Sequence, residues 1–578
     1  MGEFHNIKTR NELADFLEVP RKKLSYILYV KGISNLYTSF EINKKNGGTR
    51  KINAPSEELK DIQKKLAEAL YNHNKKKQRG NIEKISHAFE INKGIITNAQ
   101  NHRNKRFVLN IDLEDFFDSF HFGRVRGFFN KNDHFSLPLE VATVIAQVSC
   151  YEGKLPQGAP SSPVITNLIC EILDHRILKL AKQYKLDYTR YADDLTFSTN
   201  DKNFLKSQTE LYRKISKEIN RAGFKINDKK TRLQLRDSQQ IVTGLVVNKK
   251  INVSSFYYKE TRAMAHHLYK YGEFNINDNL ATLNQLEGRF SFINQLTWHN
   301  NKLDGEKHHF QRLCSRERQY QKFLFYKYFF ANSKPLIVTE GKTDIVYLKS
   351  ALKKLYEEYP NLITKKSNGK FEFKIDFLNK TKKLKHFMGI QDGGTALKNI
   401  YDFFGSQKPD INFLRYFKKT SNTLPVHPVI LMFDNEIHSG DKKPIGNFLK
   451  HTKLNEKKRE DLNHNNFVDI IDNLYLLTIP LIGDKSECDI EDLFDDSVLS
   501  HEIDGKKFTK KDNYDIRIHY GKEIFSKHIL RNYSSINFTN FKSTLDNIDN
   551  IINTYWMGGT GTVHDLKVMN KDKVLLEI

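Results

Sequence analysis

The sequence is poor in cysteine and contains no long apolar run. Its 578 residues include only four cysteines, and no two of them stand at the spacing of metal ligands. This argues against a structural zinc site and against a disulfide framework. No uninterrupted hydrophobic stretch has the length of a transmembrane helix, and the first residues lack the apolar segment of a signal peptide. We therefore expect a cytoplasmic protein with no membrane partner.

Acidic residues are few relative to basic ones. The chain has 93 Lys and Arg but 69 Asp and Glu, which gives a formal net charge of +24. Such a charge favours a polyanionic partner, because each cation placed on a phosphate releases a condensed counterion. A lysine-rich composition shared by a whole proteome is the alternative. Aromatic residues make up 12% of the chain and favour nucleic acid, since bases stack on rings.

The sequence also lacks internal repeats and low-complexity linkers. We therefore infer the domain boundaries from the order of the helical and strand-like patterns. Helical and strand-like segments alternate irregularly up to about residue 250, and residues 255–330 are helical and basic. The first part is predicted to contain strands at 106–113, 225–227 and 241–247, a hairpin at 188–198 and a helix at 206–222. After Pro335, strands alternate with helices, which is typical of a parallel α/β sheet. We expect three domains, at residues 1–250, 251–332 and 333–578.

Three aspartates are candidates for a metal-dependent polymerase site. Asp112 ends a strand-like run, and Asp193 and Asp194 lie in the turn of a predicted hairpin that begins near Tyr188. Nucleotidyl transfer uses two divalent ions about 3.5–4 Å apart, and Mg²⁺ prefers hard oxygen ligands. An isolated Asp-Asp is a common turn dipeptide. A Tyr-Ala-Asp-Asp turn downstream of a strand that ends in aspartate is far more specific.

These residues stand in the order of reverse transcriptase motifs, and the sequence resembles that family over roughly residues 40–250. The matching segments are Arg50-Lys51-Ile52 with Pro55, Ile111–Leu113 with Asp115-Phe116-Phe117, Gln157–Pro163, Tyr191–Asp194, and Gly223–Asn227 with Lys229 and Lys230. The resemblance implies an α+β right-hand polymerase with fingers, palm and thumb. It also implies two Mg²⁺ ions held by Asp112, Asp193 and Asp194, with dNTPs as substrates.

The resemblance gives roles to neighbouring residues. Five stand at positions that contact the template or the incoming nucleotide in this family, namely Arg50, Lys51, Phe117, Gln157 and Gly158. Phe117 takes the steric-gate position, where a bulky ring blocks a ribose 2′-OH. The alternative for Phe117 is a core aromatic, which is what we expect of Phe116. Lys229 or Lys230 is a candidate to protonate the leaving pyrophosphate, and the sequence does not choose between them.

Two further motifs resemble those of retron reverse transcriptases. Asn98-Ala99-Gln100-Asn101-His102 precedes the first catalytic aspartate, and Val242-Thr243-Gly244 follows the last polymerase motif. The resemblance implies a cognate non-coding RNA (msr-msd) and a branched RNA–DNA product (msDNA) primed from a guanosine 2′-OH. A satisfied structural histidine is the alternative for His102. A group II intron or diversity-generating reverse transcriptase, which makes unbranched cDNA, is the alternative for the chain.

Contacts with RNA are expected in two places. Asn98 and His102 belong to the first retron-like motif. The basic helices of residues 251–332 would form a thumb that reads the RNA by shape and backbone. Within it, Arg312, Arg316 and Arg318 lie within about two helical turns and suit phosphate contact. An ordinary solvated helical bundle is the alternative.

Acidic residues also follow the strands predicted in the C-terminal part. Glu340 follows one strand, Asp434 and Glu436 follow another, and Glu491 comes later in an acidic segment. Because α/β sheets gather ligands at the carboxyl ends of parallel strands, we expect these acids to converge. Such acids repel each other unless a cation such as Mg²⁺ offsets their charge.

This pattern looks like a Toprim domain, an α/β fold with a parallel sheet found in topoisomerases, primases and overcoming-lysogenization-defect nucleases. The resemblance implies Glu340 as general acid/base or ligand, with Asp434, Glu436 and Glu491 holding one or two Mg²⁺ ions. The usual Asp-x-Asp is here Asp434-Asn435-Glu436, so Mn²⁺ is an alternative.

The order of a retron-like polymerase and a Toprim-like domain also resembles a known retron subtype. That resemblance implies a fused effector in antiviral defence. Alternatively, acids after strands cap helices, and the domain is a non-catalytic binding module. The oligomeric state stays open.

Overall fold

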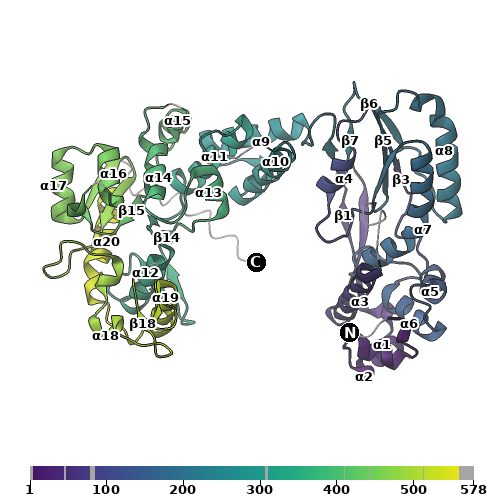
Figure 1. Ribbon diagram of the computed structural model, residues 1–578, viewed down its shortest axis with the longest axis horizontal. Coiled ribbons are helices and arrows are strands. Elements are labelled where there is room, and N and C mark those ends of the chain that lie inside the picture. The colour runs from purple at the N-terminus through teal and green to yellow at the C-terminus, as the bar shows by residue number, and fades with distance from the viewer. Residues whose placement is uncertain are drawn as a thin grey trace. The chain divides into compact units, whose positions relative to one another are not determined.

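The structure is a computed structural model that describes residues 4–44, 47–77, 85–305, 310–408, 410–440, 442–511 and 513–558. The chain forms two compact units, one ending at Ser255 and the other beginning at Phe256, and each is described by itself (Figure 1). In the described parts of the chain, every helix is too short or too polar to cross a lipid bilayer.

An antiparallel sheet of four strands lies at the centre of the first unit. Its order is β4-β5-β3-β6. The bounds are β3 (Phe107–Asp112), β4 (Asp187–Tyr191), β5 (Asp194–Thr199) and β6 (Arg232–Leu235). The central strands β3 and β5 are almost entirely buried. A strand covered on both faces carries a nearly continuous apolar sequence, as Phe-Val-Leu-Asn-Ile does in β3.

Eight helices and two hairpins complete the described part of the first unit. The helices are α1 (Arg10–Phe16), α2 (Arg21–Tyr26), α3 (Glu57–Lys77), α4 (Ile95–Asn101), α5 (Phe122–Lys131), α6 (Leu139–Ser149), α7 (Ser162–Gln183) and α8 (Phe204–Arg221). The hairpins are β1 (Tyr37–Asn43) with β2 (Thr49–Pro55), and β7 (Ile241–Val242) with β8 (Leu245–Val246). Helix α8 buries Leu211, Ile215 and Ile219, which recur every four residues and form one apolar face.

The periodic segments of this unit follow their sequence patterns closely. The strand predicted over 106–113 and the hairpin predicted over 188–198 are present within one residue at each end. The strand predicted at Lys225–Asn227 is instead an isolated bridge between Leu113 and Ile226. The run from Ile241 to Val247, predicted as one strand, bends back on itself as the β7–β8 hairpin.

The second unit begins with three helices that share a core with the sheet that follows them. They are α9 (Ser255–Tyr271), α10 (Leu283–Leu303) and α11 (Ser315–Phe325), with a short hairpin of β9 (Asn275–Ile276) and β10 (Asn279–Leu280) between the first two. The Phe325 ring stacks on Phe417 with centroids 5.9 Å apart, and both belong to this shared core. The division predicted at residue 333 therefore does not coincide with a break in packing.

A five-stranded sheet of order β14-β11-β15-β17-β16 organises the rest of this unit. The first four strands are parallel, and β16 is an antiparallel edge strand. The bounds are β11 (Leu336–Val338), β14 (Asp376–Phe377), β15 (Val429–Phe433), β16 (Phe467–Ile471) and β17 (Leu474–Thr478). Successive residues enter two different cores, with Val429 and Leu431 in one and Ile430 and Met432 in the other. Period-two alternation thus lets the sheet separate two apolar layers.

Helices and short strands surround this sheet (Figure 1). The helices are α12 (Lys342–Lys354), α13 (Lys382–Met388), α14 (Thr395–Gly405), α15 (Phe413–Thr420), α16 (Pro444–Thr452), α17 (Glu456–Asn465), α18 (Asp496–Leu499), α19 (Lys522–Asn532) and α20 (Lys542–Gly558). The short strands are β12 (Ile363–Lys365), β13 (Phe371–Phe373), β18 (Lys507–Phe508) and β19 (His519–Tyr520).

Candidate functional site

A tight hairpin turn brings three aspartates together in the first unit. Tyr191 pairs with Asp194, so Ala192 and Asp193 alone form the turn between β4 and β5. Ala192 has a φ of 55°, a left-handed conformation that a two-residue hairpin turn requires. Asp112 lies directly opposite Asp194 in the β3–β5 register. The register therefore places all three aspartates at the same end of the central strands.

The carboxylates at this end of the strands oppose one another's ionisation. Burial raises the pKa of Asp193, and the neighbouring charge of Asp112 raises it further. Burial, followed by the charges of Asp193 and Asp112, raises the pKa of Asp194 to about 7. In the described ranges, no three His, Cys, Asp or Glu side chains already surround a common point as metal ligands. The site thus holds excess negative charge that a bound cation would relieve.

Lys230 is the cation that offsets this charge in the structure. Its Nζ donates to both carboxylate oxygens of Asp112, at 3.0 and 3.1 Å. This hydrogen bond raises the pKa of Lys230. Among the described residues, Lys229 makes no such contact, so the geometry selects Lys230 from the two lysines that the sequence left open. The ammonium stands where a divalent ion would approach Asp112.

The loop after α6 is held against the β1–β2 hairpin. The Asn53 N–H donates to the Gln157 carbonyl at 2.8 Å. Gly158 has a φ of +124°, and a Cβ there would lie 2.6 Å from the Asn53 carbonyl oxygen. Only glycine permits this close approach. Arg50 and Lys51 are exposed on β2, and the charge of Arg50 lowers the pKa of Asp193, so β2 lies within electrostatic reach of the acids.

The two phenylalanines that follow Asp112 have different surroundings. Phe116 is 4% exposed, and its ring packs against Phe120 and Phe224. Phe117 is half-buried, with its ring 6.4 Å from that of Phe89. Phe116 is therefore the core aromatic that was expected, and Phe117 keeps a partly accessible face near the acids.

A fully buried ion pair anchors the strand that leads into the aspartate turn. The Arg190 guanidinium donates to both carboxylate oxygens of Asp174 on α7, and neither side chain is more than 1% exposed. The Tyr188 hydroxyl also donates to Asp174, at 2.8 Å. The carboxylate raises the pKa of Arg190 against the opposing effect of burial. This pair fixes β4 to α7 immediately before the aspartate turn.

The first retron-like motif lies inside the protein. Asn98 and His102 are both 0% exposed. The His102 ring lies 2.7 Å from the Ser198 hydroxyl and 2.7 Å from the Thr189 hydroxyl, and Thr189 donates to Asn98. Their expected role as RNA-binding residues is corrected here, because buried side chains that are bonded to β4 and β5 cannot touch RNA. They tie α4 to the strands that carry the aspartate turn.

The second retron-like motif packs against the first. Thr243 and Gly244 form the turn between β7 and β8, with φ values of 47° and 81°. The Thr243 hydroxyl donates to the Ile95 carbonyl at 3.3 Å, at the start of α4. The Asn104 N–H donates to the Val247 carbonyl at 2.9 Å. Two motifs that are far apart in the sequence thus pack together and support the four-stranded sheet of the first unit.

The buried His102 makes the stability of the first unit depend on pH. Burial lowers the pKa of His102 to about 3, whereas an unfolded histidine titrates near 6.5. Only the unfolded state therefore gains this proton between about pH 6.5 and 3, so stability falls as pH falls. By pH 5, His102 is expected to cost about 2 kcal/mol of unfolding free energy. Urea unfolding of the wild type and of His102→Gln at pH 7.5 and pH 5 measures the difference.

In this experiment the His102→Gln variant should lose less stability than the wild type on acidification. A His102 imidazole that titrates near pH 6.5 in the folded protein, followed by NMR, would contradict the assignment.

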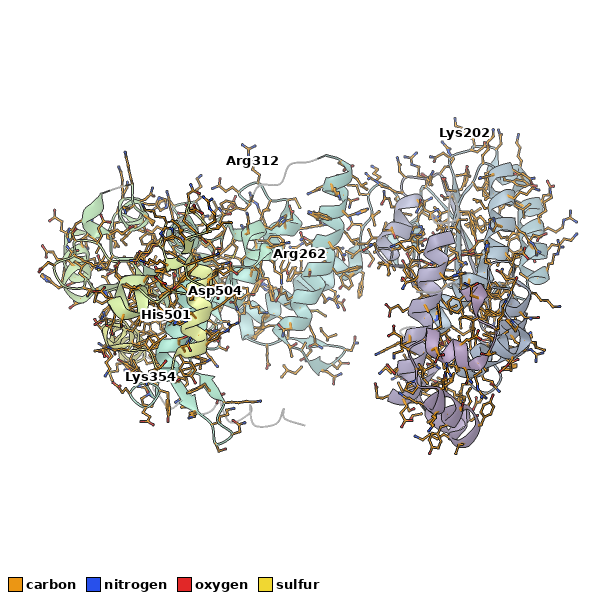
Figure 2. All side chains as sticks on the ribbon, turned by 60° about the horizontal axis from the view of Figure 1, so that its bottom comes forward. Lys202, Arg262, Arg312, Lys354, His501 and Asp504 are labelled. Atoms are coloured by element: carbon orange, nitrogen blue, oxygen red, sulfur yellow. The ribbon has the colours of Figure 1, made fainter. Side chains whose placement is uncertain are left out.

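The three arginines predicted to contact RNA belong to the second unit. Arg312 lies before α11 rather than on it, because the helix begins at Ser315 after an N-cap at Cys314. Its side chain is exposed and projects from the unit (Figure 2). The Arg316 guanidinium lies 5.0 Å from the Tyr258 ring centre, and Arg318 pairs with Asp410 at 3.4 Å. Arg312 and Arg318 remain accessible to a phosphate.

A second group of acids lies at the carboxyl end of the parallel sheet. Glu340 follows β11, and Asp434 follows β15, the neighbouring strand. The Asp434 N–H donates to Glu340 Oε1 at 3.2 Å. The Ile490 N–H donates to Asp434 Oδ1 at 3.1 Å, which brings the segment of the buried Glu491 to the same place. Three of the four predicted acids therefore converge as expected.

These acids share a buried environment with a strong excess of negative charge. Burial raises the pKa of Glu340 to about 7 and the pKa of Asp434 well above its usual range. Sequence reasoning did not include Asp344 and Asp489, whose charges further raise the pKa of Asp434. Each is close in the sequence to a predicted acid, and this closeness is the feature from which both could have been predicted. Lys522 offsets part of the charge through an ion pair of 3.0 Å with Glu491.

Glu436 lies at the margin of this group. Its carboxylate pairs with Lys443 at 2.6 Å, and Lys443 also pairs with Glu487 at 3.2 Å. The charge of Glu436 still contributes to the raised pKa of Glu340. Glu436 is thus within electrostatic reach of Glu340, but in the structure its carboxylate is bound by a lysine.

Comparison with known proteins shows which protein family the first unit resembles. The family model for reverse transcriptase (RNA-dependent DNA polymerase) matches residues 42–267. The retron Ec86 reverse transcriptase of Escherichia coli is 38% identical over 242 residues, which are 40% of this chain and 70% of that protein. The retron Mx65 reverse transcriptase of Myxococcus xanthus is 32% identical over 275 residues, 45% of this chain and 61% of that protein.

A telomerase structure from Candida albicans is more distant. It has a TM-score of 0.30 and 12% identity, and covers 50% of this chain and 60% of that one. The family assignment therefore depends on the relatives found by sequence. The aspartate turn and the two retron-like motifs, which pack together, agree with it. The chain belongs to the retron reverse transcriptase family.

Proposed function

We propose that this protein is an RNA-directed DNA polymerase that copies a cognate structured non-coding RNA (msr-msd) with dNTPs into branched msDNA. The observation that carries the proposal is the placement of Asp112 opposite Asp194 with Asp193 in the adjoining turn. Those residues stand in the segment that matches the reverse transcriptase family model.

The acids suit a pair of Mg²⁺ ions, because oxygen ligands and excess negative charge meet there. Asp112 and Asp193 would hold them, with Asp194 beside them. Bound Mg²⁺ would lower the pKa of the attacking hydroxyl and stabilise charge on the triphosphate. Lys230, which donates to Asp112 in the structure, would then release it and donate a proton to the leaving pyrophosphate.

The surrounding residues suit nucleotide selection. Arg50 and Lys51 on the exposed face of β2 would bind the triphosphate, since guanidinium and ammonium groups complement phosphate oxygens. The loop at Gln157 and Gly158 would pack on the nascent base pair, held in place by its bond to Asn53. The partly accessible ring of Phe117 would exclude a ribose 2′-OH. The thumb arginines Arg312, Arg316 and Arg318 would contact the RNA backbone.

Primer extension tests the polymerase proposal. The purified chain is incubated with a DNA primer annealed to an RNA template, the four dNTPs and Mg²⁺. Extension to the end of the template, and little extension with rNTPs, is the expected result. Failure to extend with any divalent metal would remove the polymerase assignment.

A second activity is proposed for the unit that begins at Phe256, because its parallel sheet gathers acids at one end. It would be a Toprim-like nuclease that acts as an antiviral effector. Glu340 would act as general acid/base, which its pKa of about 7 suits at neutral pH. Asp434 and Glu491, joined by Glu436 after it leaves Lys443, would hold one or two Mg²⁺ or Mn²⁺ ions.

Replacing Glu340 with glutamine should reduce nuclease cleavage by roughly a hundredfold or more, since general acid/base catalysis contributes about that much. The variant keeps the shape of the side chain and should keep primer extension. Glu372→Gln, at an exposed carboxylate paired with Lys366, is the matched control and should cleave normally. Cleavage and phage protection that survive Glu340→Gln would favour the non-catalytic binding module instead.

A further inference from the structure

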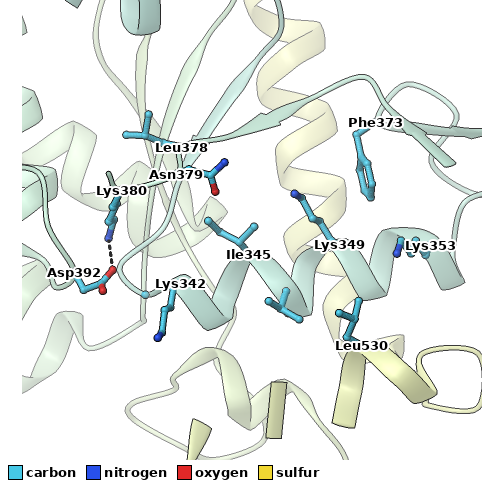
Figure 3. Close-up of a pocket in the computed structure, with 12 residues that line it drawn as sticks. Lys342, Ile345, Lys349, Lys353, Phe373, Leu378, Asn379, Lys380, Asp392 and Leu530 are labelled. Atoms are coloured by element: carbon cyan, nitrogen blue, oxygen red, sulfur yellow. Dashed lines mark ion pairs between the residues drawn. The ribbon is translucent and has the colours of Figure 1, made fainter. Parts of the chain in front are cut away.

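A cavity of about 590 Å³ in the second unit is lined in part by Gly341, the residue that follows Glu340 (Figure 3). Helix α12 forms one wall, the segment Leu378–Lys380 after β14 forms another, and Leu530 of α19 also lines it. Its charged lining consists of four lysines and one aspartate, namely Lys342, Lys349, Lys353, Lys380 and Asp392. Positive charge is therefore concentrated in the cavity.

Three of the lysines follow one helix. Lys342, Lys349 and Lys353 extend over about 16 Å of α12, at the helical rise of 1.5 Å per residue. Lys349 and Lys353 are four residues apart on the same helix face, where like charges repel. A run of cations along one wall suits an extended anion better than a compact one.

Two of these cations have no carboxylate partner among the described residues. The Lys349 Nζ lies 5.2 Å from the Phe377 ring centre and 5.7 Å from that of Phe373, and the Lys353 Nζ lies 5.5 Å from that of Tyr533. Both side chains are half-buried against these rings. A half-buried ammonium held on aromatic faces keeps its charge available to an incoming anion.

Two lining residues of the cavity connect it to Glu340. Gly341 lines the cavity and directly follows Glu340 in the chain. The Lys380 Nζ donates to the Glu340 carbonyl oxygen at 2.6 Å and lies 3.8 Å from Asp392, the ion pair drawn in Figure 3. A ligand lying along the lysines would thus reach Gly341, next to Glu340 in the chain.

We propose that this cavity binds the sugar-phosphate backbone of a nucleic-acid strand and guides it to the acids at Glu340. Lys342, Lys349 and Lys353 contact successive phosphates, and the Phe373 ring offers a face on which a base stacks. The proposal rests on the proposed nuclease activity and names its substrate class. A free mononucleotide fits less well, because its phosphates would meet only one end of the row of lysines.

Lysine footprinting of the full chain tests the proposal without requiring cleavage. The protein is acetylated in EDTA with and without single-stranded DNA or RNA of about 20 nucleotides, at a concentration that saturates binding by fluorescence anisotropy. Mass spectrometry then measures each lysine. Acetylation of Lys349 and Lys353 should fall about fivefold with at least one of the two strands. The exposed Lys385 and Lys457, outside the cavity, serve as references.

Unchanged acetylation of Lys349 and Lys353 at saturation would overturn the proposal, because the strand would then lie elsewhere on the chain. Equal protection by inorganic phosphate alone would also overturn it, since that marks a site for a single phosphate. The test separates the two proposals. Protection without any cleavage keeps the strand site and removes the nuclease, and cleavage without protection does the reverse.

A pair of charge-matched variants gives an independent measurement. Lys349→Gln with Lys353→Gln should weaken cleavage of a limiting oligonucleotide through a higher KM, with kcat nearly unchanged, because these residues bind substrate away from the acids. Lys385→Gln with Lys457→Gln removes the same charge elsewhere and should leave KM unchanged. Equal effects of the two pairs would mean that only net charge matters, which would contradict the proposal.

Discussion

Replacing Asp193 and Asp194 together with asparagine is expected to abolish DNA synthesis, lowering it by roughly a thousandfold or more. The loss follows from removing two carboxylates that would hold the catalytic ions, which contribute several kcal/mol to transition-state stabilisation. The fold should survive, because asparagine keeps the shape of each side chain and relieves repulsion that raises the pKa of Asp194. Primer extension on an RNA template measures the effect.

A matched control separates this chemistry from a general loss of charge. Asp187 stands at the start of the same hairpin, pairs with Lys105, and is distant in register from the turn. Asp187→Asn should extend the primer at nearly the wild-type rate. Substantial incorporation by the Asp193→Asn, Asp194→Asn protein would mean that the metal ions bind elsewhere.

Replacing Arg190 with methionine is expected to destabilise the first unit by about 3–5 kcal/mol. Methionine removes the cation and leaves the Asp174 carboxylate buried without its charge partner. The β4 strand would loosen where it enters the aspartate turn, so primer extension should fall as well. Hydrogen exchange of the β4 and β5 amides in urea reports the unfolding free energy of this unit separately from the rest of the chain.

Two further sets of variants test whether the loss of the buried ion pair causes this destabilisation. Arg21 pairs with Asp15 at the surface, and Arg21→Met should change the stability far less than Arg190→Met, as exposed ion pairs contribute little. Replacing both Arg190 and Asp174 by apolar residues of similar size should recover part of the stability. A cost from Arg190→Met as small as that from Arg21→Met would show that the buried pair does not hold the hairpin.

The sequence predicted the elements that have a clear period and a clear end. The strand before Asp112 and the hairpin around Tyr191 could be predicted because apolar runs end at turn residues there. Helix α8 could be predicted because its buried residues recur at helical spacing. The convergence of Glu340 with Asp434 was also predictable, since both follow adjacent parallel strands.

Long-range packing was beyond the sequence patterns. From the sequence alone, an arginine such as Arg190 would be expected at the surface. The structure shows that Asp174 on α7 faces it. Asn98 and His102 were expected to bind RNA, and only the contact of His102 with Ser198 shows why they are buried instead. The boundary expected at residue 333 followed a change of pattern, but Phe325 packs across it against Phe417.

The two retron-like motifs gain a physical explanation from this packing. The turn at Thr243 holds the start of α4, and the end of α4 places His102 between Thr189 and Ser198. Both motifs therefore support the strands that carry the aspartates. Because Asn98 and His102 are buried, any RNA contact would be made by exposed residues instead.

We expect this polymerase to make a branched RNA–DNA molecule. The decisive experiment is to sequence the nucleic acid that copurifies with the full chain, before and after treatment with a debranching enzyme that cuts 2′,5′ bonds. The expected product is a single-stranded DNA joined to the 2′ position of one guanosine in an RNA encoded beside the protein. That product should be missing from the Asp193→Asn, Asp194→Asn protein. Recovery of unbranched cDNA alone, unaffected by the debranching enzyme, would overturn the proposal of a branched product.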